Sequence, residues 1–214
     1  MAHDHTVEIS SDGVSLEGEL MIPESAKGIV LFAHGSGSSR FSPRNQFVAQ
    51  FLRKHKLATL LTDLLTFEED KVDQITREFR FNIDLLAERL IGITRWLQKD
   101  PRTKNLHIGY FGSSTGAAAA LIAAAQEGSE ISAVVSRGGR PDLAGPYLQK
   151  VQAPSLLIVG GADGEVIKLN QEAYDHLSCV KRLDIVPGAT HLFEETGALE
   201  KVAALAATWF TNYL

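Results

Sequence analysis

The sequence predicts an α/β fold in which a mostly parallel sheet is flanked by helices. Two observations predict it. Several apolar runs do not alternate with polar residues, as in strands buried on both faces, and helical patterns separate these runs along the chain. Strands and helices in alternation favour a parallel sheet with right-handed crossovers. No Pro-rich or Gly/Ser-rich linker and no repeat divides the 214 residues, so we expect one domain over residues 1–214.

The strands are predicted in chain order from their hydrophobic patterns. Alternating runs at 6–10 and 14–20, joined by an Asp12-Gly13 turn, predict an antiparallel hairpin. The continuous apolar runs that predict buried strands are 28–33, 57–61, 106–111, 132–135 and 155–159. A last run, 182–186, alternates again, as a strand at the edge of a sheet does.

Helices are predicted between the strands. The clearest has apolar residues three or four apart on one face, at Phe79, Ile83, Leu86, Leu90, Ile93 and Leu97. Shorter patterns at 47–52 and 199–213 predict two more helices. Residues 117–125 are apolar all round, which indicates a helix buried between the sheet and other helices.

Composition excludes several classes of function. The chain has 21 lysines and arginines and 26 aspartates and glutamates, so its net charge is 21 − 26 = −5. It therefore lacks the positive field that would attract a nucleic acid or an anionic membrane. The longest apolar stretch, 117–125, is far shorter than the roughly 20 residues of a membrane helix. With only one cysteine, Cys179, and no secretory pattern in residues 1–5, we expect a cytoplasmic protein.

The residues that follow each strand carry the chemistry, because ligands bind beyond the carboxyl ends of a parallel sheet. After the run 106–111 the chain reads Gly112-Ser113-Ser114-Thr115-Gly116, a G-x-S-x-G elbow between a strand and a helix. Ser114 is the nucleophile candidate, and Ser113 is expected to be structural. Alternatively, Ser114 only caps the helix.

A serine nucleophile needs a base and an acid that orients the base. Asp163 and His191 each follow a predicted strand, and the order Ser114, Asp163, His191 is that of α/β hydrolases. The alternatives are that Asp163 caps a helix, that Glu165 or Asp142 supplies the acid, and that His191 is an ordinary loop histidine.

The oxyanion of acyl transfer needs inward backbone N–H donors. A glycine-rich loop, His34-Gly35-Ser36-Gly37, follows the strand 28–33, and the Ser36 and Thr115 amides are the predicted donors. His34 is expected to shape the turn by a hydrogen bond.

These ordered motifs resemble the α/β-hydrolase superfamily, and most closely its small dienelactone-hydrolase-like members. The resemblance runs nearly end to end. It implies a mostly parallel eight-stranded sheet and a metal-free hydrolase of esters, lactones and related bonds. One departure matters: the namesake enzymes use a cysteine nucleophile, whereas this chain has Ser114 there and its only cysteine at Cys179.

Cofactor and metal sites are not expected. No G-x-G-x-x-G or Walker loop is present, and the seven histidines do not cluster with carboxylates at ligand spacing.

The loops predict an open cleft for small soluble acyl compounds. The segment 137–154 is too short for a lid domain, and 64–80 makes at most a small flap. Two loop arginines, Arg137 and Arg140, are candidates to clamp a substrate carboxylate or phosphate. Arg40 and Arg44 could extend that rim. The alternative is that each pairs with an acidic neighbour such as Asp142 or Asp63.

The sequence thus predicts a serine hydrolase that cleaves small carboxylic esters, thioesters or lactones through an acyl-enzyme on Ser114. The alternatives are a non-catalytic binding module of the same fold and an acyltransferase that uses the same three residues. The natural substrate and the oligomeric state are left open.

Overall fold

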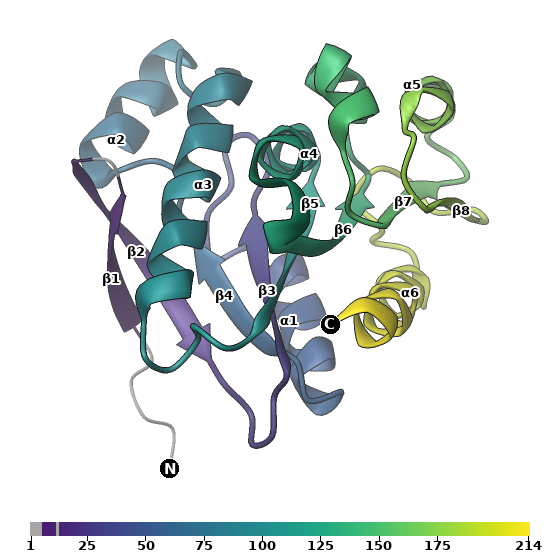
Figure 1. Cartoon of the computed structure of the whole chain (residues 1–214). Helices are drawn as coiled ribbons and strands as arrows, with labels where there is room; N and C mark the ends of the chain where they lie inside the picture. The colour runs from purple at the N-terminus through teal and green to yellow at the C-terminus, as the bar shows by residue number, and fades with distance from the viewer. Residues whose placement is uncertain (1–5, 12) are drawn as a thin grey trace.

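The computed structural model in Figure 1 describes residues 6–11 and 13–214. Its centre is one eight-stranded sheet in the order β1-β2-β4-β3-β5-β6-β7-β8. β2 pairs antiparallel with β1 and β4, and all other neighbours are parallel. The strands are β1 (Thr6–Ser11), β2 (Val14–Met21), β3 (Gly28–Ala33), β4 (Ala58–Thr62), β5 (His107–Ser113), β6 (Ile131–Arg137), β7 (Ser155–Gly160) and β8 (Lys181–Val186). The predicted mostly parallel α/β-hydrolase sheet is confirmed.

Helices cover both faces of the sheet, as Figure 1 shows. One face packs against the first and last helices, and the other against the helices between them. The helices are α1 (Pro43–Lys54), α2 (Phe67–Thr76), α3 (Ile83–Lys99), α4 (Thr115–Glu127), α5 (Gly164–His176) and α6 (Ala198–Tyr213). Two 3-10 segments, η1 (Gly128–Glu130) and η2 (Pro141–Lys150), complete the chain.

The central strand β3 shows why its apolar run does not alternate. Successive side chains of a strand point to opposite faces. Ile29 and Leu31 pack in the cluster that contains α3 and α4, whereas Val30 and Phe32 pack in the cluster that contains α1 and α6. Both faces are therefore buried, and every position of the strand is apolar or glycine.

Two edges of the sheet match the alternating sequences. β1 and β2 form the predicted hairpin, with Ile9 opposite Leu16, and Asp12 of the predicted turn lies outside the described residues, as do residues 1–5. β8 forms the other edge, where Arg182 and Ile185 are exposed.

One helix starts later than its pattern predicts. Phe79 belongs to the apolar face in the sequence, but α3 begins at Ile83, after the N-cap Asn82. The Phe79 N–H donates to Asp73 Oδ1 at 2.8 Å, which holds Phe79 in the turn before the helix.

The loops above the carboxyl ends of the strands are short. Between β6 and β7 the described chain forms only η2, so no lid domain is inserted there. The predicted flap at 64–80 contains α2, whose capping box joins Thr66 and Glu69. Within residues 6–11 and 13–214, no helix is both long enough and apolar enough for a membrane span.

Candidate active site

The elbow between β5 and α4 holds Ser114 in an unusual backbone conformation. Its φ and ψ are 51° and −122°, outside the regions that side-chain-bearing residues ordinarily adopt. The flanking glycines make this turn sterically possible. A Cβ on Gly112 would overlap Ala117 Cα, and a Cβ on Gly116 would overlap the carbonyl oxygen of Ala33. Such a turn presents the serine hydroxyl at the top of the sheet, beside the free N–H groups that begin α4.

Asp163 and His191 meet although they are far apart in the sequence. Asp163 Oδ2 lies 2.7 Å from His191 Nδ1. Asp163 is the N-cap residue of α5, yet its side chain makes no capping hydrogen bond. The structure therefore shows the pairing with His191 and not the capping role. Of the rival acids, Asp142 binds Arg140, and Glu165 lies in the first turn of α5.

Ser114 and His191 come to the same edge of the sheet. The Ser114 N–H donates to the carbonyl of Arg137 at 3.3 Å, and a Cβ on the next residue, Gly138, would lie 3.6 Å from His191 Cε1. Within the described chain the Ser114 hydroxyl has no hydrogen bond. The structure thus shows the contact between Asp163 and His191. The Ser114–His191 hydrogen bond and the catalytic triad stay predictions. Hydrogen bonds of this kind often tighten only when substrate binds.

Glu195 braces the loop that carries His191. Its carboxylate accepts the Thr190 hydroxyl at 2.6 Å and the Thr190 N–H at 3.0 Å. The Thr190 hydroxyl lowers the pKa of Glu195, so the carboxylate stays ionised. No sequence pattern indicates this contact, because a glutamate five residues from a threonine is ordinary in any loop.

The two residues of the predicted oxyanion donors, Ser36 and Thr115, are hydrogen-bonded to each other. Thr115 is the first residue of α4, where an N–H has no partner within the helix. The Ser36 N–H donates to Thr115 Oγ1 at 3.0 Å, and the two hydroxyl oxygens are 2.8 Å apart. In this structure the Ser36 N–H is therefore bonded to the Thr115 side chain, and its role as an oxyanion donor stays a prediction.

His34 shapes the loop, as predicted. Its Nε2 accepts the Leu64 N–H at 3.0 Å, so the ring proton is on Nδ1, which lies 3.0 Å from the Gly35 carbonyl. Burial lowers the pKa of His34 and keeps the ring neutral. His34 thus joins the loop after β3 to the loop after β4.

A buried polar cluster lies under the elbow. The Ser113 hydroxyl donates to Asn45 Oδ1 at 3.0 Å, and Arg137 Nη2 donates to Ser113 Oγ at 2.9 Å and to Asn45 Oδ1 at 3.1 Å. This confirms a structural role for Ser113. Arg137 is only 6% exposed. Burial, with the neighbouring Arg44 charge, lowers the pKa of Arg137 to about 10. Asn45 was not predicted, since only the folded chain brings α1 to β5.

The other arginines of the predicted rim have acidic partners. Arg140 binds both carboxylate oxygens of Asp142, at 2.9 and 2.8 Å. Arg40 binds Asp63 and Glu17. The alternative stated for these side chains is what the structure shows, and the role of Arg137 and Arg140 in binding substrate stays a prediction.

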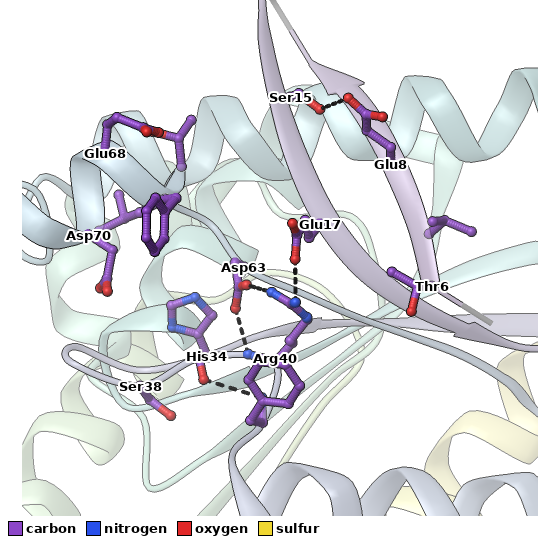
Figure 2. Close-up of a pocket in the computed structure, with 16 residues that line it drawn as sticks. Thr6, Glu8, Ser15, Glu17, His34, Ser38, Arg40, Asp63, Glu68 and Asp70 are labelled. Atoms are coloured by element: carbon purple, nitrogen blue, oxygen red, sulfur yellow. Dashed lines mark hydrogen bonds and ion pairs between the residues drawn. The ribbon is translucent and has the colours of Figure 1, made fainter. Parts of the chain in front are cut away.

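A cleft of about 930 Å³ lies beside the oxyanion loop and is shown in Figure 2. His34 and Ser38 form one wall, and the Arg40 guanidinium lies between Asp63 and Glu17 at another. Phe41 and Phe67 line the cleft as well and are 64% and 68% exposed. Ser114 and His191 are not among the lining residues, so the cleft flanks the site.

No metal site accompanies this arrangement in the part of the chain that is described. Among residues 6–11 and 13–214, no group of three His, Cys, Asp or Glu side chains could hold a metal ion.

Comparison with known proteins shows the family. Residues 16–213 match the profile of the dienelactone hydrolase family. This chain belongs to the dienelactone hydrolase family. A crystal structure of dienelactone hydrolase from Anabaena variabilis is 57% identical, covers 99% of this chain and 98% of its own, and superposes with a TM-score of 0.98. The predicted resemblance is confirmed, and membership of this family supports a hydrolase.

Two further similar proteins limit what the comparisons show about the activity of this chain. Est1E from Butyrivibrio proteoclasticus has a TM-score of 0.80 over 97% of this chain and 98% of its own, but at 16% identity it shows the fold alone. A Mycobacterium tuberculosis protein whose name proposes a phosphoribosyl transferase is 54% identical over 211 residues, which are 99% of this chain and 47% of that protein. This chain therefore spans about half the length of the curated relatives that it matches.

Proposed function

We propose that this chain is a serine hydrolase that cleaves small carboxylic esters, thioesters or lactones through an acyl-enzyme on Ser114. The observation that carries the proposal is the 2.7 Å contact between Asp163 and His191 at the edge where the strained Ser114 begins α4. A base that is already oriented by a carboxylate, near a partly exposed serine, is the arrangement that activates a serine nucleophile.

The proposed first half-reaction transfers the acyl group to the enzyme. His191 Nε2 takes the Ser114 hydroxyl proton as Oγ bonds to the substrate carbonyl carbon, and the Ser36 and Thr115 amides receive the resulting oxyanion. His191 then gives the proton to the leaving oxygen or sulfur while its bond to carbon breaks. Asp163 stabilises the imidazolium that exists between these two proton transfers.

In the second half-reaction water replaces the leaving group. His191 takes a proton from water as the water oxygen bonds to the acyl carbon, and the Ser114–carbon bond breaks when His191 returns the proton to Oγ. The products are a carboxylic acid and the free enzyme. Arg137 and Arg140 remain the proposed contacts for an anionic group on the substrate, and Arg140 is the more exposed of the two.

The M. tuberculosis relatives have names that propose a phosphoribosyl transferase, and they are about twice as long as this chain. We assign acyl-transfer chemistry to this chain because it contains the elbow around Ser114, Asp163 and His191. The free Cys179 fits our proposal that the protein works in the reducing cytoplasm.

The test compares wild-type protein with Ser114→Ala on a panel of small esters, thioesters and lactones. We expect turnover of at least one class by wild type and its loss in Ser114→Ala. A fluorophosphonate probe should label wild type at Ser114 and should not label His191→Ala. Wild-type protein that neither turns over the panel nor takes up the probe would indicate the non-catalytic binding module. Faster acyl transfer to an added amine or thiol than to water would indicate the acyltransferase.

A further inference from the structure

A chain of hydrogen bonds connects the oxyanion loop to a segment that lies outside the predicted triad. The Ser36 hydroxyl donates to the carbonyl oxygen of Arg80 at 3.1 Å. Because a hydroxyl has only one proton, the 2.8 Å contact between Ser36 Oγ and Thr115 Oγ1 must use the proton of Thr115. The order of donation is therefore Thr115 to Ser36 to Arg80.

Arg80 is fixed by a buried carboxylate at the end of α2. Asp73 is 1% exposed, and its Oδ1 accepts the backbone N–H groups of Phe79 and Arg80 at 2.8 and 2.9 Å. Its Oδ2 accepts Arg80 Nε at 2.6 Å, and Arg80 Nη2 donates to the Asp73 carbonyl at 2.9 Å. Both the backbone and the guanidinium of Arg80 are thus held by one residue.

The guanidinium also lies beside the oxyanion loop. Gly37 has a φ of 67°, and a Cβ at this position would lie 3.0 Å from Arg80 Nη1. Ser36 is thus bound to the Arg80 carbonyl, and the Arg80 guanidinium fills the space beside Gly37. The hydrogen bond from Ser36 therefore ties the oxyanion loop to a segment that Asp73 holds in place.

We propose that Arg80 and Asp73 are positioning residues that hold the Ser36 N–H in place to receive the oxyanion. The proposal rests on the proposed function, because it assigns these residues a role in the same reaction. When the substrate carbonyl displaces Thr115 Oγ1 from the Ser36 N–H, the bond from Ser36 Oγ to Arg80 keeps the loop in register. Since displacement of a catalytic group by about 1 Å can cost roughly 100-fold in rate, loosening this support should reduce kcat.

The test uses Arg80→Met and Asp73→Asn with Arg89→Met as the matched control. Arg89 Nη2 binds Glu69 Oε1 at 2.6 Å. Like Arg80, it pairs with a carboxylate of α2, but its ion pair does not include the oxyanion loop. We expect Arg80→Met and Asp73→Asn to lower kcat about 10- to 100-fold with KM changed less than about threefold. Arg89→Met should stay within about threefold of wild type.

Two further readouts separate positioning from general loss of structure. A boronic acid mimics the tetrahedral intermediate, so its inhibition constant should rise in Arg80→Met by the same factor as kcat falls. The affinity of Arg80→Met for the carboxylic acid product should stay that of wild type. Because the support passes through Ser36 Oγ, the Ser36→Ala, Arg80→Met double variant should lose little more kcat than the more impaired of the two single variants.

Equal losses in Arg80→Met and Arg89→Met, or single losses that multiply in the double variant, would overturn the proposal. If Arg80→Met does not fold, the nearly isosteric Asp73→Asn decides by the same kcat and inhibitor measurements. Failure of the proposed function has a different outcome: wild type itself would then be inactive and unlabelled by fluorophosphonate, and both proposals would fall.

Discussion

Asp163→Asn tests the acid of the predicted triad with little disturbance of the fold. The substitution keeps the size of the side chain and removes the charge that faces His191 Nδ1 at 2.7 Å. Because the Asp163 side chain makes no capping hydrogen bond to α5, the change should alter the free energy of unfolding by less than about 1 kcal/mol. Activity should fall far more than stability.

The size of the activity loss follows from the attraction between the carboxylate and the imidazolium. With charge centres about 4 Å apart and an effective dielectric constant of about 20, that attraction is about 4 kcal/mol. The His191 side chain is 39% exposed, so solvent screens part of it. We take about 2–4 kcal/mol, which corresponds to a 30- to 1000-fold loss of kcat/KM. Loss of the correct ring tautomer would add to this figure.

The assay is hydrolysis of the best ester of the panel by wild type, Asp163→Asn and two control variants. Asp142→Asn and Glu165→Gln remove the rival carboxylates and should each stay within about threefold of wild type. Thermal unfolding of all four proteins checks the fold. An Asp163→Asn loss below about tenfold, or one matched by Glu165→Gln, would refute the assignment of Asp163.

Three other outcomes follow from the same contacts. Ser114→Gly should raise the free energy of unfolding by about 1 kcal/mol and Tm by about 2–4 °C. The reason is that relief of about 1–3 kcal/mol of backbone strain exceeds the entropic cost of glycine. A lower Tm would argue against strain at the elbow. Although burial favours the protonated acid, hydrogen bonds from Arg80 and Phe79 hold the pKa of Asp73 below its usual value. The stability that Asp73 contributes is therefore complete above its unfolded pKa of about 3.9 and is lost as pH falls through the folded value, so urea unfolding between pH 5 and 3 should show a smaller decline for Asp73→Asn than for wild type. Arg140→Gln should lower kcat/KM about three- to tenfold for a carboxylate-bearing ester and leave a neutral ester unchanged; equal losses on both esters would remove the proposed anion contact.

The sequence could predict the parts of the structure that local patterns determine. The unbroken apolar run of β3 implies burial on both faces, and the structure packs Ile29 and Val30 into opposite cores. The spacing of Gly112 and Gly116 around Ser114 implies a turn too tight for side chains, and both glycines contact backbone closely. Steric rules of this kind act over a few residues and can be read without the fold.

Contacts between distant segments could not be predicted in the same way. Asn45 binds Ser113, which is 68 residues away, and Ser36 binds Arg80, which is 44 residues away. Common polar residues at these positions carry no pattern that identifies their partners. Phe79 shows the converse case, since its apolar spacing fits the helix but its N–H is held by Asp73 before the helix begins. Hydrogen bonds between segments that are distant in the sequence determine the conformation at these residues.

Trapping the acyl-enzyme tests the central claim most directly. Wild-type protein is mixed with an activated ester, quenched with acid within the first turnover, digested and analysed by mass spectrometry. The account predicts one acyl group on the peptide that contains Ser114, with none in Ser114→Ala. Rapid turnover without a covalent intermediate, or an acyl group on Cys179 instead, would contradict it.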